Sequence, residues 1–125
     1  MGTHKQLEVW KNAMELVKAV YSQTKKFPKE ELFCLTSQIR RAAVSVPANI
    51  SEGSARMHSK EFIYFLRISF GSLSELETLL IIALELDYLD KGNYEVLLNQ
   101  IKIITVQLSR LIHVIEKKIP NSSHH

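Results

Sequence analysis

Residues that interrupt regular structure are scarce in this sequence of 125 residues. It contains only 4 glycines and 3 prolines, too few for the frequent turns of a β-rich fold. The composition therefore favours long helices. The single cysteine, Cys34, cannot form an intramolecular disulfide, and Phe33 and Leu35 flank it. We expect a buried, unreactive thiol there.

Long uncharged hydrophobic runs are absent as well. No stretch of about 18 apolar residues is free of charge, so we expect no membrane-spanning helix and no membrane contact. The first 12 residues include Lys5, Glu8 and Lys11 and do not resemble a signal peptide. These features predict a cytoplasmic protein.

Motifs for catalysis and metal binding are also missing. A di-iron site in a helical bundle needs Glu-x-x-His on two helices, and His113 with Glu116 gives only a reversed pair on one helix. No serine lies in Gly-x-Ser-x-Gly, and no glycine-rich phosphate loop occurs. We expect a non-enzymatic protein without a metal or another cofactor.

Apolar residues recur at helical spacing in four segments, which predicts an all-α fold. The expected helices cover about 7–26, about 29 to 53–57, about 59–86 with Ser59 as N-cap, and about 94–118, with a last loop over 87–93 that contains Gly92. Short loops between helices of this length predict an antiparallel up-down four-helix bundle. It forms one domain, residues 1–120, followed by a tail, 121–125, which ends in His124 and His125.

Two of these helices carry more apolar residues than one core can cover. The third helix has three apolar stripes, and Val96, Ile103 and Val114 lie off the main stripe of the fourth. A helix that is apolar over so much of its circumference needs a further partner. We therefore expect the chain to form a homo-oligomer.

A proline interrupts the apolar pattern of the second helix. Pro47 has no backbone N–H, so the carbonyl group of Ala43 loses its helical partner and a kink is expected. We expect Ser45, Asn49 and Ser51 to bond freed backbone groups with their side chains.

Gly53, further along the second helix, has two possible roles. It caps the helix, or it is a point of close packing if the helix continues for another turn.

Three segments, 37–53 (SQIRRAAVSVPANISEG), 61–66 (EFIYFL) and 71–77 (GSLSELE), resemble the 23S rRNA intervening-sequence protein family of bacteria. The resemblance covers roughly residues 5–118, with Ser51 and Ser69 at positions where we expect alanine. It implies a helical bundle that assembles into a ring, a pentamer, and a relation to an accessory protein of diversity-generating retroelements that binds nucleic acid. The structural motif comprises Pro47, Asn49, Glu52, Gly53 and Glu77.

Charge is distributed unevenly, although the net charge is only +3. Residues 71–90 hold five acidic residues and no basic one, whereas the preceding helices are basic. The candidates for nucleic-acid binding are Lys25, Lys26, Arg40, Arg41, Arg56, Lys60 and Arg67. Without a recognition motif, contact with RNA or DNA would be electrostatic and tolerant of sequence. The equally weighted alternative is that the arginines form salt bridges in a subunit interface.

Two acidic residues also have structural interpretations. Glu77 lies between two apolar stripes, so we expect it to be partly buried and paired with Arg40 or Arg41. The second helix also has an outward stripe that is a candidate subunit interface, because opposite charges flank small residues in it: Arg41, Ser45, Ala48 and Glu52.

The sequence thus predicts a homo-oligomeric accessory protein that associates with nucleic acid. The alternative is a ring that binds another protein as a scaffold and has no affinity for nucleic acid.

Overall fold

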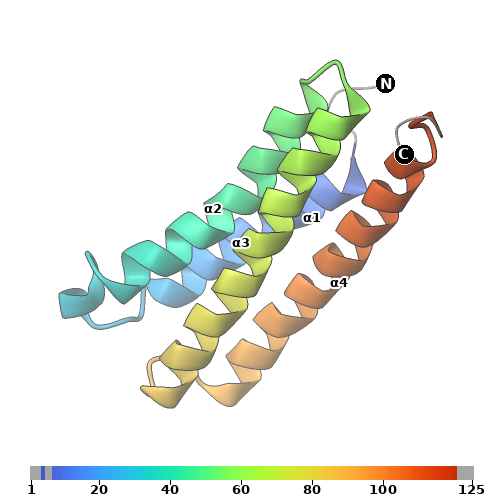
Figure 1. Ribbon diagram of the computed structural model, residues 1–125. Coiled ribbons are helices and arrows are strands. Elements are labelled where there is room, and N and C mark those ends of the chain that lie inside the picture. The colour runs from blue at the N-terminus through green and yellow to red at the C-terminus, as the bar shows by residue number, and fades with distance from the viewer. Residues whose placement is uncertain (1–3, 5–6, 121–125) are drawn as a thin grey trace.

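Four long helices make up the chain in the computed structural model, which describes residue 4 and residues 7–120. They are α1 (Glu8–Thr24), α2 (Leu35–Ser54), α3 (Ser59–Glu85) and α4 (Lys91–Glu116), with a short 3-10 helix, η2 (Lys29–Glu31), before α2 (Figure 1). No strand occurs in these residues, so the all-α prediction is confirmed. The predicted tail, 121–125, lies outside the described residues.

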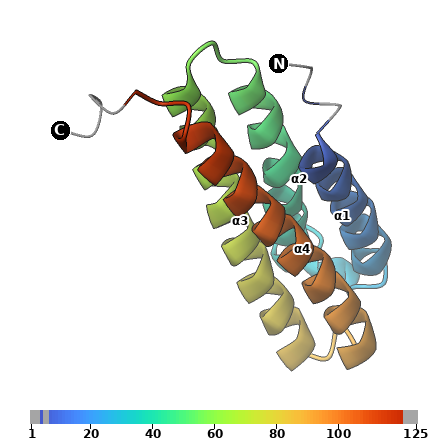
Figure 2. The same ribbon diagram turned by 90° about the vertical axis from the view of Figure 1, so that its right-hand side faces the viewer.

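Each helix packs against two neighbours, which makes a four-helix bundle. α1 contacts α2 and α4, and α3 contacts the same two helices. The α2–α3 loop, the start of α1 and the end of α4 lie at one end of the bundle, and η2 and the α3–α4 loop lie at the other (Figures 1 and 2). Among the described residues no helix is long and apolar enough to cross a membrane.

The core contains the main apolar stripes that the sequence indicates. Leu66, Leu76 and Leu80 of α3 and Ile104 and Leu108 of α4 are almost completely buried. The additional stripes are only partly covered. Ile63 and Leu79 are buried in the bundle, but other apolar residues of these stripes and of α4 are exposed on its surface: Ile68, Ile81, Ile82, Leu86, Val96, Ile103 and Val114. One copy of the chain therefore leaves apolar side chains uncovered on both α3 and α4.

Hydrogen bonds between α2 and α3 lie close to Pro47, which is buried inside α2. The hydroxyl group of Ser69 donates to the carbonyl oxygen of Val46 at 2.8 Å, and the hydroxyl oxygens of Ser45 and Ser72 are 2.8 Å apart. Asn49 donates from Nδ2 to the carbonyl oxygen of Ser45 at 2.8 Å. Small polar residues therefore link α2 to α3 at the level of the proline.

The expectation that local side chains bond the freed carbonyl group was only partly correct. Asn49 bonds a backbone oxygen, but that oxygen belongs to Ser45, and no described side chain bonds the carbonyl of Ala43. The hydroxyl group of Ser51 lies 3.4 Å from Nε2 of His4. The other backbone bond near the proline comes from Ser69 on a different helix, which a local sequence pattern does not reveal.

Gly53 is a point of close packing and not a helix cap. α2 continues to Ser54, and none of the described glycines has a positive φ. A Cβ atom at Gly53 would lie 2.9 Å from Cδ1 of Phe62 and from Cβ of Phe65, and 3.1 Å from the backbone oxygen of Phe62. The missing side chain lets the first turn of α3 approach the last turn of α2.

Helix boundaries differ from the expectation at three places. The chain forms η2 and then turns before α2 begins at Leu35, whereas a continuous helix from about 29 was expected. The N-cap of α3 is His58, so Ser59 is already helical. α4 begins at Lys91 because the side chain of Asp90 accepts a hydrogen bond from the backbone of Asn93 at 2.7 Å.

The last loop is therefore shorter than the expected 87–93. Gly92 lies inside α4 and does not provide the freedom for the turn. Among the described non-glycine residues only Asp87 adopts a positive φ, of 61°, and it makes this turn.

Gly53→Ala should destabilise the protein, because the added methyl group meets Phe62 and Phe65 in the buried α2–α3 contact. We expect overpacking to exceed the gain in helix propensity and to lower the free energy of unfolding by about 1–2 kcal/mol. Gly71→Ala is the matched control, since nothing lies within 4 Å of a Cβ atom there. It should raise stability by up to about 1 kcal/mol in urea unfolding. Equal effects of the two substitutions would contradict the close packing.

Candidate nucleic-acid interface and apolar groove

The basic residues predicted to bind nucleic acid divide between two ends of the bundle. Lys25 and Lys26 follow α1, and Arg40 joins them because its Nε donates to Thr24 Oγ1 at 2.9 Å. Arg40 also lies over the ring of Tyr21, with its guanidinium carbon 4.5 Å from the ring centre. Arg41 follows on the exposed face of α2.

Arg56, Lys60 and Arg67 lie at the opposite end, near the α2–α3 loop. Arg40 and Arg56 are about 24 Å apart along α2, at 1.5 Å per residue. The structure therefore does not bring all seven predicted residues into one site.

Three of the seven basic side chains already have partners. Besides the contacts of Arg40, Arg56 pairs with Glu52 at 2.6 Å and lies 3.8 Å from Glu61, and Arg67 pairs with Glu116 at 3.1 Å. These exposed ion pairs are individually weak and can exchange for other partners. Among the described residues Lys25, Lys26, Arg41 and Lys60 form no ion pair.

Lys60 shares a surface hollow with a lysine that the sequence alone did not indicate. The hollow has a volume of about 470 Å³ and lies between the α2–α3 loop and the end of α4. We call it the basic hollow; its lining residues are Met57, His58, Ser59, Lys60, Lys118, Ile119 and Pro120. Lys118 lies at the end of the helix expected over about 94–118, and its distance from Lys60 in the sequence conceals that the two lysines line the same hollow.

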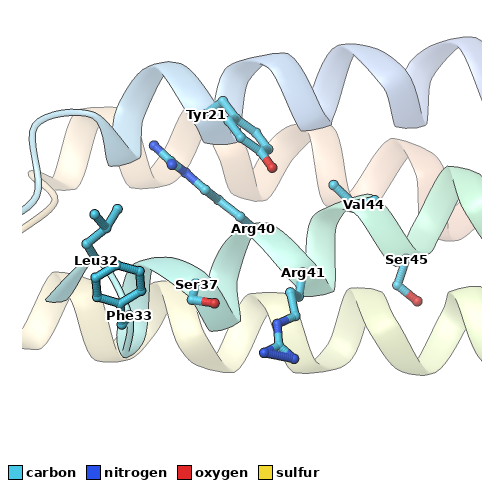
Figure 3. A pocket seen from close by; sticks show the side chains of 8 residues that line it. All are labelled: Tyr21, Leu32, Phe33, Ser37, Arg40, Arg41, Val44 and Ser45. Carbon is cyan, nitrogen blue, oxygen red and sulfur yellow. The ribbon is translucent and has the colours of Figure 1, made fainter.

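A larger hollow lies on the outer face of α2, where it meets the end of α1. Its volume is about 580 Å³. We call it the apolar groove; it is lined by Tyr21, Leu32, Phe33, Ser37, Arg40, Arg41, Val44 and Ser45 (Figure 3). Arg40 extends toward Tyr21, whereas Arg41 points to the other side of α2 (Figure 3). The most exposed of its apolar side chains is Phe33, at 89% of its surface.

Glu31 fixes the segment that carries Leu32 and Phe33. Its Oε1 accepts a hydrogen bond from the backbone N–H of Leu35 at 3.3 Å, and its Oε2 accepts one from the hydroxyl group of Tyr88 at 3.0 Å. One carboxylate thus joins the start of α2 to the α3–α4 loop. The pKa of Tyr88 is raised because its hydroxyl group bonds this carboxylate, with a further contribution from burial.

Comparison with known proteins identifies the family. Residues 5–110 match the 23S rRNA-intervening sequence protein family. The chain belongs to this family. No curated protein matches the sequence.

The fold of this intervening-sequence family member is also found in a solved structure. A protein of unknown function from the S23 ribosomal protein family of Bacteroides thetaiotaomicron is 25% identical, with a TM-score of 0.77. The similarity covers 83% of this chain and 97% of the other. The predicted family resemblance and its helical fold are thus confirmed.

Cys34 of this family member is exposed, and the expectation of a buried thiol was wrong. The flanking apolar residues suggested burial, but the chain breaks between η2 and α2. Cys34 is the N-cap of α2, with a φ of −122° and a ψ of −106°, so the 32–34 segment turns outward.

Glu77 is partly buried, as expected, but it pairs with neither Arg40 nor Arg41. It lies on the side of α3 that faces α4, near Tyr94. The pKa of Tyr94 is raised by burial and then by the carboxylates of Glu77 and Glu95. The sequence correctly indicated that Glu77 is partly buried, but it did not indicate that Glu77 faces α4.

The described residues contain no group of three or more histidine, cysteine, aspartate or glutamate side chains placed to hold a metal ion.

Tyr88→Phe should destabilise the fold at neutral pH, because Glu31 loses the hydroxyl group that it binds. The raised pKa implies that this contribution is complete below about pH 10 and is lost as the pH rises through the pKa of the folded state. The difference in unfolding midpoint between the parent and the variant should therefore stay constant up to about pH 10 and decrease as the pH rises further. Tyr64→Phe, at an exposed tyrosine, is the control. A difference that stays constant with pH would rule out this linkage.

Proposed function

We propose that this protein is a non-enzymatic, cytoplasmic accessory protein that assembles with copies of itself and binds nucleic acid through phosphate contacts. Its helices form an antiparallel up-down bundle, and the copies form a ring, with five members if the implied family pattern holds. The observation that carries the nucleic-acid contact is the basic hollow, where Lys60 and Lys118 line the same surface.

The basic hollow offers positive charge without an internal partner. Lys60 and Lys118 form no ion pair with a described residue. Lys117 is exposed beside them. Arg56 and Arg67 are held by exposed ion pairs, and the guanidinium carbon of Arg56 also lies 4.9 Å from the ring centre of Phe65. A phosphate group can take either arginine from its carboxylate partner at little cost, since surface pairs contribute roughly 0–1 kcal/mol.

Self-assembly would strengthen this contact. A cyclic ring repeats every surface by rotation about its axis, so the basic hollows of all copies lie at the same height around that axis. With five members, the net charge of +3 per chain becomes about +15, and the field of the ring is more continuous than that of one copy.

The binding should be tolerant of sequence. The described residues contain no strand that could present stacking aromatic residues to RNA, and the hollow contains no aromatic side chain except His58. Affinity would then come from released counterions and fall steeply with salt. The family takes its name from an insertion in 23S rRNA, so structured RNA is the first nucleic acid to test.

Lys60→Gln with Lys118→Gln should weaken binding to a mixed-sequence RNA by roughly tenfold or more at about 0.1 M salt. The salt dependence of the binding constant should flatten by roughly one unit for each phosphate group that the variant no longer neutralises. Fluorescence anisotropy over a salt series measures both quantities. Lys25→Gln with Lys26→Gln removes the same charge at the opposite end and should have a much smaller effect.

Two results would contradict the proposal. If the Lys25 and Lys26 variant loses affinity instead, the contact lies at the other end of the bundle. If the parent protein binds no RNA or DNA at low salt, the nucleic-acid function is wrong, and the alternative of a protein-binding scaffold replaces it.

A further inference from the structure

The lining of the apolar groove has the composition of a protein–protein interface. Aromatic residues and arginine are enriched in interface cores, while lysine and acidic residues are depleted. The groove contains Tyr21, Phe33 and two arginines, with neither lysine nor an acidic residue among its lining side chains. Such a surface favours an apolar partner with negative charge near it.

Phe33 has the properties of an anchor residue. It lies outside α2, so its side chain contributes to neither helix propensity nor the bundle core. Glu31 and Tyr88 nevertheless fix the backbone that carries it. An aromatic side chain that is rigidly presented beside a groove loses little conformational entropy when a partner covers it.

A complementary surface lies on the same chain, on the outer face of the second half of α3. Ile82 and Leu86 are 40% and 50% exposed there. Glu85 is exposed on the same side and pairs with none of the described residues. No basic residue occurs between 71 and 90, so this face is apolar and acidic.

We infer that the α3 face formed by Ile82, Glu85 and Leu86 of one copy docks into the apolar groove of a second copy. This inference rests on the proposed self-assembly and names its two surfaces. Charge complementarity identifies the occupant, because Arg41, which lines the edge of the groove and points to the other side of α2, and Glu85 on α3 both lack an ion-pair partner among the described residues.

The contact joins two different surfaces, so each copy can use both at once. Such a head-to-tail contact produces a closed ring if the rotation between copies closes, and a filament if it does not. Arg41 also shares a smaller hollow with Glu75 of its own chain, without an ion pair. For that reason the charge exchange described below changes Glu85 and leaves Glu75 as it is.

Phe33→Ser tests the groove. The substitution leaves the core unchanged, so the circular-dichroism spectrum of the folded variant should match that of the parent. The dissociation constant for self-assembly, from sedimentation over a concentration series, should rise roughly 30-fold. Met57→Ser is the control, because Met57 is a similarly exposed apolar residue that also lies outside the helices, in the α2–α3 loop and outside both surfaces. Assembly of the Phe33 variant at the parent's concentration would overturn the inference.

A charge exchange tests the pairing of the two surfaces. Arg41→Glu and Glu85→Lys should each weaken assembly by on the order of tenfold. The double variant, which restores opposite charges across the contact, should recover most of the loss. Two weakened single variants without recovery in the double variant would overturn the α3 face as the partner of the groove. A parent protein that is monomeric at all concentrations would instead overturn the proposed self-assembly.

Discussion

The close contact between α2 and α3 sets the geometry of the bundle. Gly53 admits the first turn of α3, and the hydroxyl groups of Ser45, Ser69 and Ser72 bond across the contact. Ser69 is completely buried, so its bond to the carbonyl group of Val46 is protected from water. A larger side chain at these positions would separate the two helices and expose the apolar stripes that they bury together.

The same contact determines which surfaces remain for function. Because α2 packs on α3 with small residues, its outer face keeps the larger side chains and forms the apolar groove with the end of α1. The α2–α3 loop and the end of α4 gather lysines at one end of the bundle. The two proposed roles are therefore separate in space: the groove and the outer face of α3 hold copies together, and the basic hollow contacts phosphate groups.

The sequence predicted the regular parts of this fold better than the site. The stripes of α3 and α4 repeat over many turns, so periodicity identified the residues of their core, including Leu66, Leu76 and Leu108. It missed the break before α2, because Leu32, Phe33 and Leu35 continue an apolar pattern, whereas the carboxylate of Glu31 bonds the backbone of Leu35 and the hydroxyl group of Tyr88. The bond between Glu31 and Tyr88 joins residues 57 positions apart.

The sequence predicted only part of the candidate site, because contacts between residues far apart in the sequence again decide the rest. Basic residues are visible in a sequence, but their surroundings are not. Arg67 pairs with Glu116, and Lys60 lines the same hollow as Lys118, only because α3 and α4 are packed together. The direction of Glu77 depends on which neighbour its side of α3 faces. Such facts depend on the angle between helices, which a single helical pattern does not contain.

Pro47 and the α2–α3 contact should behave as one energetic unit. A double-mutant cycle of Pro47→Ala and Ser69→Ala, measured by urea unfolding, is the decisive measurement. If the path of α2 at the proline positions the carbonyl group of Val46 for Ser69, the two substitutions should couple by about 1 kcal/mol. Additive effects, within about 0.3 kcal/mol, would show that the proline and the interhelical hydrogen bond are independent and would contradict this dependence.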